Sequence, residues 1–254
     1  MYAEVLSTEQ LTPTMIRIVL GGGTLDQFDM VPATDAYINA RFLPQDSTLM
    51  VPFASEDLDK IDAEHRPRPR RYTIRRWDEQ RHELTIDFVA HGDAGYAGPW
   101  AQRAAPGDRL QFSGPGGSFQ PSPRADWHLL IGDESALGAI GATLESLPAG
   151  RRAMVFVVVD GPDHELDLPT QADAEIIWLH RDGHSDSDLE SLLVDAVSAA
   201  EFLVGSFDVF LHGEAAEVRA VRKHLIADRG VNPDTASISA YWRRKHTEIG
   251  RAHV

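Results

Sequence analysis

Six arginines lie close together in residues 66–76, whose sequence RPRPRRYTIRR contains no acidic residue. The chain as a whole is acidic, with a formal net charge of −15 and only 24 lysines and arginines. A solvated basic loop is one interpretation of such a run. However, Arg71, Tyr72, Thr73 and Arg75 alternate as in a strand, so that guanidinium groups, an aromatic ring and a hydroxyl can project into one site. The segment therefore predicts a site for a planar, phosphorylated ligand.

The chain contains no cysteine. This excludes disulfides, thiolate nucleophiles and cysteine-ligated zinc or iron–sulfur clusters. Redox chemistry would therefore need a bound organic cofactor, or a metal held by nitrogen and oxygen ligands. His180 and His184 have the spacing of a helical metal-binding pair, but the Arg-Asp-Gly between them is typical of a turn. We expect no protein-bound metal and no nucleophilic side chain.

Length and composition are those of an ordinary globular protein. The 254 residues are 43% hydrophobic and 25% charged, enough for one large domain or two small ones. No apolar run approaches the length of a membrane span, and the N-terminus lacks the pattern of a signal peptide, so we expect a cytoplasmic location. The negative charge argues against general nucleic-acid binding.

The first half of the chain is a series of short strands separated by turn residues. The pattern predicts strands over residues 14–21, 35–42, 71–77, 83–89 and 108–113. Residues 43–69, rich in proline and aspartate, indicate a long loop. This spacing is typical of an antiparallel β-barrel.

Near residues 121–124 the pattern changes, and strands begin to alternate with helices. The predicted strands are 127–131, 154–159, 176–179, 209–212 and 237–240, and the predicted helices are 135–147, 186–202 and 214–229. Such alternation indicates a parallel sheet with both faces covered. We therefore predict two domains, residues 1–121 and 122–254.

Two strand-to-helix crossings in the second half are candidates for a ligand site, because ligands of such sheets bind at the carboxyl ends of strands. The crossings contain Gly132, Asp133, Glu134 and Ser135 in one case, and Gly213 and Glu214 in the other. Neither has the GxGxxG pattern, and each alone is also explained as a tight turn before an acidic first helical turn. Neither crossing contains a bulky side chain, so we expect room for a dinucleotide there. The N–H groups at the helix N-termini would act as hydrogen-bond donors to it.

A barrel with an Arg-Tyr-Thr strand, followed by a nucleotide-binding sheet, resembles the ferredoxin-reductase-like flavoenzymes. Within that group the chain resembles the siderophore-interacting proteins, which are flavin-dependent ferric siderophore reductases, over nearly its whole length. The resemblance rests on short motifs in a fixed order: RYTIR at 71–75, DFVAHG at 87–92, PWA at 99–101, PGD at 106–108, GPGG at 114–117, GDESAL at 132–137, WLHR at 178–181, GEA at 213–215 and YWRR at 241–244.

The resemblance implies an FAD-binding barrel followed by an NAD(P)H-binding nucleotide fold. It implies that Arg71, Tyr72 and Thr73 lie along the flavin ring and its phosphates, and that the stretch from His91 to Trp100 continues the pocket. Tyr72 would stack on the ring, Arg71 would pair with the pyrophosphate, and N–H groups near Pro99 would meet anionic oxygens. The cofactor-binding residues implied in the first half are Arg71, Tyr72, Thr73, Arg75, Asp87, His91, Pro99 and Trp100.

Two positions depart from the family pattern. The family has Pro-Ala-Ser-x-Trp where this chain has Ala97-Gly98-Pro99-Trp100, so a phosphate-facing serine hydroxyl is missing at Gly98. Gly138 stands where the family often has proline, which changes helix geometry. His91 also has a structural interpretation, as a histidine that ends a strand.

The implied activity is electron transfer from NAD(P)H through FAD to Fe(III) held by a siderophore, with iron as substrate. In the second half, the two crossings would hold the nicotinamide nucleotide, and Arg181 is a candidate partner for a 2′-phosphate. The segment after the last strand would line the exposed flavin face and attract anionic ferric siderophores. Its residues are Tyr241, Trp242, Arg243, Arg244 and Lys245. The alternative for this segment is a basic tail that complements a helix end.

Two other functions fit the same sequence. One is a general NAD(P)H flavin reductase, or diaphorase, with another electron acceptor. The second is a non-catalytic siderophore-binding domain with a vestigial flavin site, and the intact Arg-Tyr-Thr strand argues against it. The sequence leaves the choice between NADH and NADPH open.

Overall fold

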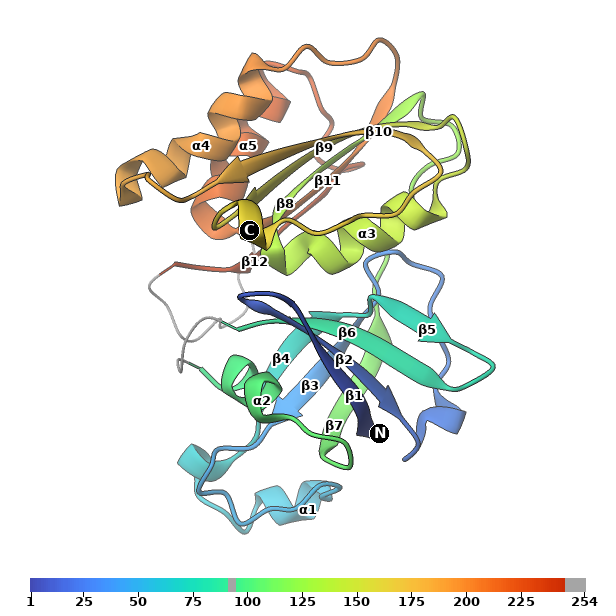
Figure 1. The fold of residues 1–254 in the computed structure, drawn as a ribbon, viewed down its shortest axis with the longest axis vertical. Helices are drawn as coiled ribbons and strands as arrows, with labels where there is room; N and C mark the ends of the chain where they lie inside the picture. The colour runs from blue at the N-terminus through green and yellow to red at the C-terminus, as the bar shows by residue number, and fades with distance from the viewer. Residues whose placement is uncertain (91–94, 245–254) are drawn as a thin grey trace. The chain divides into compact units, whose positions relative to one another are not determined.

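The computed structural model describes residues 1–90 and 95–244 (Figure 1). Two of the predicted site residues, His91 and Lys245, lie outside these ranges. The chain divides into two compact units, Met1–Ser118 and Phe119–Val254. No helix within the described ranges has the length and apolar character that a membrane crossing requires.

The first unit is built on a seven-stranded antiparallel sheet in the order β4-β3-β7-β1-β2-β6-β5. Its strands are β1 (Tyr2–Thr12), β2 (Met15–Gly21), β3 (Tyr37–Phe42), β4 (Arg68–Thr73), β5 (Arg76–Asp78), β6 (Glu83–Val89) and β7 (Arg109–Gly116), and its helices are α1 (Ser55–Leu58) and α2 (Ala97–Arg103). The rings of Tyr72 on β4 and Phe88 on β6 have centroids 4.4 Å apart, so the sheet curls on itself as a barrel does.

Alternation along β6 shows how the barrel core forms. Leu84, Ile86 and Phe88 are fully buried, and the residues between them are partly exposed. A period of two puts successive side chains on opposite faces, so one face of β6 fills the core. The sequence predicted this strand with the same bounds.

The second unit is built on a five-stranded parallel sheet in the order β10-β9-β8-β11-β12. Its elements are β8 (Trp127–Asp133), α3 (Leu137–Ser146), β9 (Arg152–Val159), β10 (Asp173–His180), α4 (Asp186–Ala199), β11 (Phe207–Glu214), α5 (Ala215–Ala227) and β12 (Ser237–Trp242). Numbered along the unit, the strand order is 3-2-1-4-5. The order therefore reverses between β8 and β11, which is where open sheets of this kind bind ligands.

Helices cover both faces of this sheet. Leu129 and Ile131 on β8 belong to one apolar cluster with side chains of α4 and α5. The adjacent Gly132 faces the other way, because a Cβ placed there would lie 3.3 Å from Ile140 of α3. Because both faces of the sheet are covered, its central strands are buried on both sides and consist of nearly continuous apolar runs rich in β-branched residues and leucine.

The predicted fold class is confirmed, with two differences in detail. Strand β1 was not predicted, and the predicted strand 71–77 is two strands, β4 and β5. Between them the Ile74 N–H donates to Ala36 O at 2.7 Å, and the Arg75 N–H donates to Thr85 O at 2.9 Å. The chain thus leaves β3 and joins β6 within two residues, which a pattern of alternation does not reveal.

Candidate functional site

Strand β4 presents two arginines and a tyrosine on its inner face. It lies at the edge of the first sheet and pairs with β3, with Ile38 opposite Tyr72 and Ala40 opposite Arg70. Ile38 and Ala40 are fully buried, and directly opposed residues share a face. Tyr72 and Arg70 therefore lie on the inner face of the strand, and Arg71 lies on the outer face.

Arg71 and Thr73 share the outer face of β4. Arg71 is exposed, and its guanidinium lies 4.9 Å from the centre of the Tyr37 ring. The sequence prediction placed Arg71 beside Tyr72, but the alternation places Arg70 there. Arg70 was missed, and its spacing of two residues from Tyr72 is the signal that identifies it.

Tyr72 is held by a cluster of aromatic rings. Its ring centroid lies 6.0 Å from that of Phe42 and 4.4 Å from that of Phe88. Trp100 on α2 packs against both phenylalanines at 5.6 Å. Burial raises the pKa of Tyr72 far above its ordinary value of 10.0, with Arg70 opposing part of the rise, so the hydroxyl stays protonated as a donor.

Arg68 lies on the inner face as well, opposite Phe42. Its Nε is buried and has no hydrogen-bond partner within residues 1–90 and 95–244, and its guanidinium lies 5.9 Å from the Tyr96 ring centre. A buried donor without a partner is rare in folded proteins and is explained if a ligand oxygen binds it. The inner face of β4 thus combines cationic groups with an aromatic surface, which suits a phosphorylated ligand with a flat ring.

Other residues predicted for this site have structural contacts. Asp87 forms a bidentate ion pair with Arg17 across β2 and β6, with N–O distances of 2.7 and 2.8 Å. Pro99 and Trp100 lie in α2. A Cβ at Gly98 would lie 3.3 Å from Ala90 Cα, so a side chain there would point at the end of β6.

Asp133, the last residue of β8, forms hydrogen bonds to the ends of β11 and β12. It is 1% exposed. Its Oδ1 accepts hydrogen bonds from the N–H and the hydroxyl of Ser135, at 2.9 and 2.5 Å. Its Oδ2 accepts from the Glu214 N–H on β11 at 2.8 Å and from the Trp242 indole N–H on β12 at 2.7 Å. The carboxylate therefore lies at the point where the strand order reverses.

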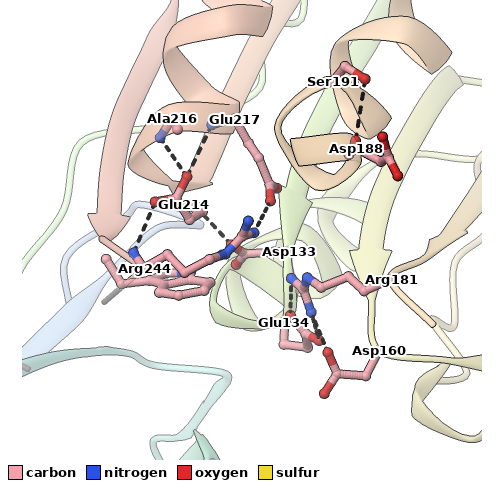
Figure 2. A network of polar contacts seen from close by, with 11 residues as sticks. Asp133, Glu134, Asp160, Arg181, Asp188, Ser191, Glu214, Ala216, Glu217 and Arg244 are labelled. Carbon is pink, nitrogen blue, oxygen red and sulfur yellow. Dashed lines mark hydrogen bonds and ion pairs between the residues drawn. The ribbon is translucent and has the colours of Figure 1, made fainter. Parts of the chain in front are cut away.

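Glu214 caps helix α5 with its own side chain. Its Oε2 accepts from the N–H groups of Ala216 and Glu217 at 2.5 and 3.1 Å, and its Oε1 accepts from the Arg244 N–H at 3.0 Å (Figure 2). From the sequence we predicted that the backbone N–H groups at the start of this helix donate hydrogen bonds to a bound nucleotide. For these two N–H groups that prediction was wrong, because a carboxylate of the protein already occupies them.

Glu217 and Arg244 form a buried ion pair beside this cap. Glu217 is 2% exposed, and its Oε1 accepts from Arg244 Nη2 at 2.7 Å (Figure 2). Its Oε2 is buried with no partner in the described part of the chain. Burial and then the Asp133 carboxylate raise the pKa of Glu217 to about 7, against the pull of Arg181 and Arg244. Glu217 was missed, although its place three residues after Glu214 is typical of a capped helix start.

Arg181, which follows β10, is neutralised by two carboxylates. Its Nη1 and Nη2 donate to the two oxygens of Glu134 at 2.5 and 2.8 Å, and Nη1 also donates to Asp160 Oδ1 at 2.9 Å (Figure 2). Burial raises the pKa of Glu134, and Arg181 opposes part of that rise. From the sequence we predicted Arg181 as a candidate partner for a 2′-phosphate, but both of its Nη atoms are engaged by carboxylates of the protein. Its Nε is buried without a hydrogen-bond partner among the described residues.

The glycines of the two crossings permit close packing. A Cβ at Gly132 would lie 2.5 Å from Ala136 Cβ and 2.7 Å from His212 O. Gly213 has a φ of +152°, and a Cβ there would lie 2.7 Å from Asp133 Oδ2. This corrects the expectation that these glycines leave room for a ligand: they let the two crossings touch.

The predicted substrate-binding segment is partly anchored to the acids. Trp242 and Arg244 bond to Asp133, Glu214 and Glu217, as described above. The Tyr241 ring lies 4.7 Å from the ring of buried His212, and Arg243 is exposed. Burial lowers the pKa of His212 to about 3, so this imidazole is neutral.

Two family models match the chain. The siderophore-interacting FAD-binding domain matches residues 4–119, and the siderophore-interacting protein model matches residues 125–245. An uncharacterized protein of Mycobacterium tuberculosis is 40% identical over 96% of this chain and 90% of its own length. The chain belongs to the siderophore-interacting protein family.

Proteins with a named activity or a known structure are also similar to this chain along most of their length. The NADPH-dependent ferric-chelate reductase of Escherichia coli is 31% identical over 95% of this chain and 92% of its own length. The crystal structure of a siderophore utilization protein from T. fusca superposes with a TM-score of 0.83 at 31% identity, covering 98% of this chain and 95% of that one.

The first unit of this siderophore-interacting protein is accordingly an FAD-binding domain. The residues around β4 fit FAD on two counts. The unpartnered Arg68 Nε is a donor for a phosphate oxygen, and the braced Tyr72 ring is a surface for a flat heterocycle.

Proposed function

We propose that this protein is a ferric siderophore reductase that takes electrons from NADH or NADPH and passes them through FAD to siderophore-bound Fe(III). The observation that carries the proposal is the inner face of β4, where Arg68, Arg70 and Tyr72 offer an FAD site in a siderophore-interacting protein. The ferric-chelate reductase activity in the name of the Escherichia coli relative supports the same reaction.

FAD, when bound, supplies the conversion of a two-electron hydride into single electrons, which a chain without cysteine has no iron–sulfur cluster to perform. The protein binds and orients it. Phe42, Phe88 and Trp100 fix the Tyr72 ring, and the protonated Tyr72 hydroxyl donates a hydrogen bond. The arginines of β4 pair with the phosphates. The contact first predicted from Arg71 stays a prediction.

The second unit is proposed to bind the nicotinamide nucleotide at the ends of β8 and β11, where the strand order reverses. Among the described residues, the polar network at this edge contains five carboxylates and two guanidinium groups: Asp133, Glu134, Asp160, Glu214 and Glu217, with Arg181 and Arg244. This excess of negative charge suits the uncharged nicotinamide and ribose, and disfavours a phosphate in the same place.

Fe(III) is the substrate, and the siderophore presents it. The aromatic residues of the proposed siderophore contact, Tyr241 and Trp242, end β12 instead of following the last strand as the sequence predicted. They stay proposed contacts for an anionic ferric siderophore, together with exposed Arg243, the cation just after β12 that the acid cluster does not engage. Arg244 contributes indirectly, by fixing this segment through Glu217.

A comparison of electron acceptors tests the proposal against a general flavin reductase. The FAD-loaded protein is given NADH or NADPH, with either a ferric catecholate siderophore or an artificial quinone acceptor. We expect turnover with the ferric siderophore, recorded as Fe(II) trapped by a chromogenic chelator. Rapid reduction of the quinone without any Fe(II) from the siderophore would establish the general reductase instead.

A further inference from the structure

Three side chains follow one another along the inner face of β4: Tyr72, then Arg70, then Arg68. Successive side chains on one face of a strand lie about 7 Å apart, so the Cα atoms of Tyr72 and Arg68 are about 13 Å apart. In the other direction from Tyr72 comes Ile74, which is apolar and 2% exposed. On the proposed function, on which this inference rests, the flavin ring lies against Tyr72, and its phosphates then extend toward the start of β4.

The guanidinium of Arg68 is oriented but not neutralised. Its carbon lies 5.9 Å from the centre of the ring of Tyr96, the residue just before α2. Contact with an aromatic face orients a guanidinium, while its N–H donors lie in its own plane and stay available. In residues 1–90 and 95–244, its buried Nε has no hydrogen-bond partner and no carboxylate forms an ion pair with it. Such a group is explained if a phosphate oxygen binds it.

The surroundings of Arg68 supply few other donors for a phosphate. Phe42, opposite Arg68 in the strand pair, is apolar. Helix α2, which follows Tyr96, has the sequence AGPWAQR and contributes no hydroxyl group. Arg66, two residues earlier in the chain, is exposed and donates from its Nε to Ile61 O at 3.3 Å. Of the described side chains on the inner face of β4, Arg68 is therefore the charged donor that lies beyond Arg70.

FMN and FAD have the same ring, ribityl chain and first phosphate, and FAD adds a second phosphate with adenosine. We propose that Arg68 binds this second phosphate, and that the contact makes the first unit select FAD over FMN. Arg70, which is nearer to Tyr72 on the same face, pairs with the phosphate that the two flavins share. Arg68 therefore contributes to the affinity for FAD and not to the affinity for FMN.

The test is calorimetric titration of the full-length, flavin-free protein with FAD and, separately, with FMN, which reports on this contact without any turnover. We expect the wild type to bind FAD at least about tenfold more tightly than FMN. Arg68→Met keeps the aliphatic stem, removes the charge and the donors, and should weaken FAD binding about tenfold while FMN binding stays within about twofold. Arg70→Met should weaken the binding of both flavins. Arg66→Met is the matched control, because Arg66 is an exposed arginine outside β4, and it should change neither affinity.

Equal losses of FAD and FMN affinity in Arg68→Met overturn the proposal, because they place the effect of Arg68 on the shared part of the flavin or on the fold. Unchanged FAD affinity in this variant, an equal loss in Arg66→Met, or a wild type that binds both flavins equally overturns it as well. Arg68→Gln serves as a second variant if Arg68→Met does not show the wild-type circular dichroism spectrum. Formation of Fe(II) by the FAD-loaded wild type tests the proposed function separately, because a protein can bind FAD through Arg68 and still fail to reduce a ferric siderophore.

Discussion

Glu217→Gln should make the protein more stable relative to wild type as the pH rises. In the folded protein the pKa of Glu217 is raised from 4.5 to about 7, chiefly by burial. A carboxyl group whose pKa is raised on folding stabilises the protein fully below its unfolded pKa, and this contribution is lost as the pH rises through the folded pKa. The groups that face Glu217 are Asp133, Glu214, Arg181 and Arg244.

The size of the effect follows from the rise in pKa. A change from 4.5 to about 7 corresponds to about 3 kcal/mol of unfolding free energy, lost by the wild type between about pH 4.5 and pH 8. Glutamine does not titrate, so Glu217→Gln should gain about that amount over wild type across this range. At about pH 4.5, where Glu217 is protonated in the folded state, the two proteins should have similar stability.

Urea unfolding of the two full-length proteins, followed by far-ultraviolet circular dichroism at about pH 4.5 and pH 8, measures this difference. Subtraction cancels the contribution of every titrating group whose pKa does not depend on the charge of Glu217. Glu201→Gln is the control, because Glu201 is exposed and forms no ion pair within the described residues. A stability difference between Glu217→Gln and wild type that stays constant within about 0.5 kcal/mol would refute the reasoning.

Two further predictions concern backbone and strand geometry. Arg70→Ala should weaken FAD binding about tenfold or more, and Arg71→Ala should weaken it less, because Arg70 shares the inner face of β4 with Tyr72 and Arg71 lies on the outer face. An FAD titration with the reverse order would contradict this. Gly213→Ala should destabilise the protein by at least about 1 kcal/mol, because the new Cβ would lie 2.7 Å from a buried carboxylate oxygen and the backbone φ is +152°. Gly161→Ala is the control and should destabilise it less, because a Cβ at Gly161 would have no atom within 4 Å. Thermal unfolding of both variants checks this, and equal losses would show that the close approach is not the cause.

Most of the fold was predictable from periodicity. Alternation identified β6, and continuous apolar runs identified the buried strands of the parallel sheet. Strand β1 was missed because residues from Leu6 to Gln10 are exposed and mostly polar, and strands of this kind are stabilised by pairing rather than by a buried face. Hydrogen bonds to β2 hold β1 extended from Glu4 to Thr12, and the local sequence of β1 does not reveal this pairing.

The site was predictable in part. Asp133, Glu134 and Glu214 were identified from their place at two strand ends. Their partners were not, because these come from distant positions: Trp242 lies 109 residues from Asp133, and Arg181 lies 47 residues from Glu134. The strand order brings these side chains together, and a single sequence does not specify strand order. The arginines were therefore interpreted as ligand contacts before their carboxylate partners were known.

The most direct test of the account is a single-turnover experiment without oxygen. The FAD-loaded protein is reduced with one equivalent of NADH, and then mixed with excess ferric siderophore and a chromogenic Fe(II) chelator. The account predicts that the flavin absorbance returns while two Fe(II) form for each flavin, because two electrons leave one at a time. A flavin that stays reduced in the presence of the ferric siderophore, yet is reoxidised at once by an artificial acceptor, would contradict it.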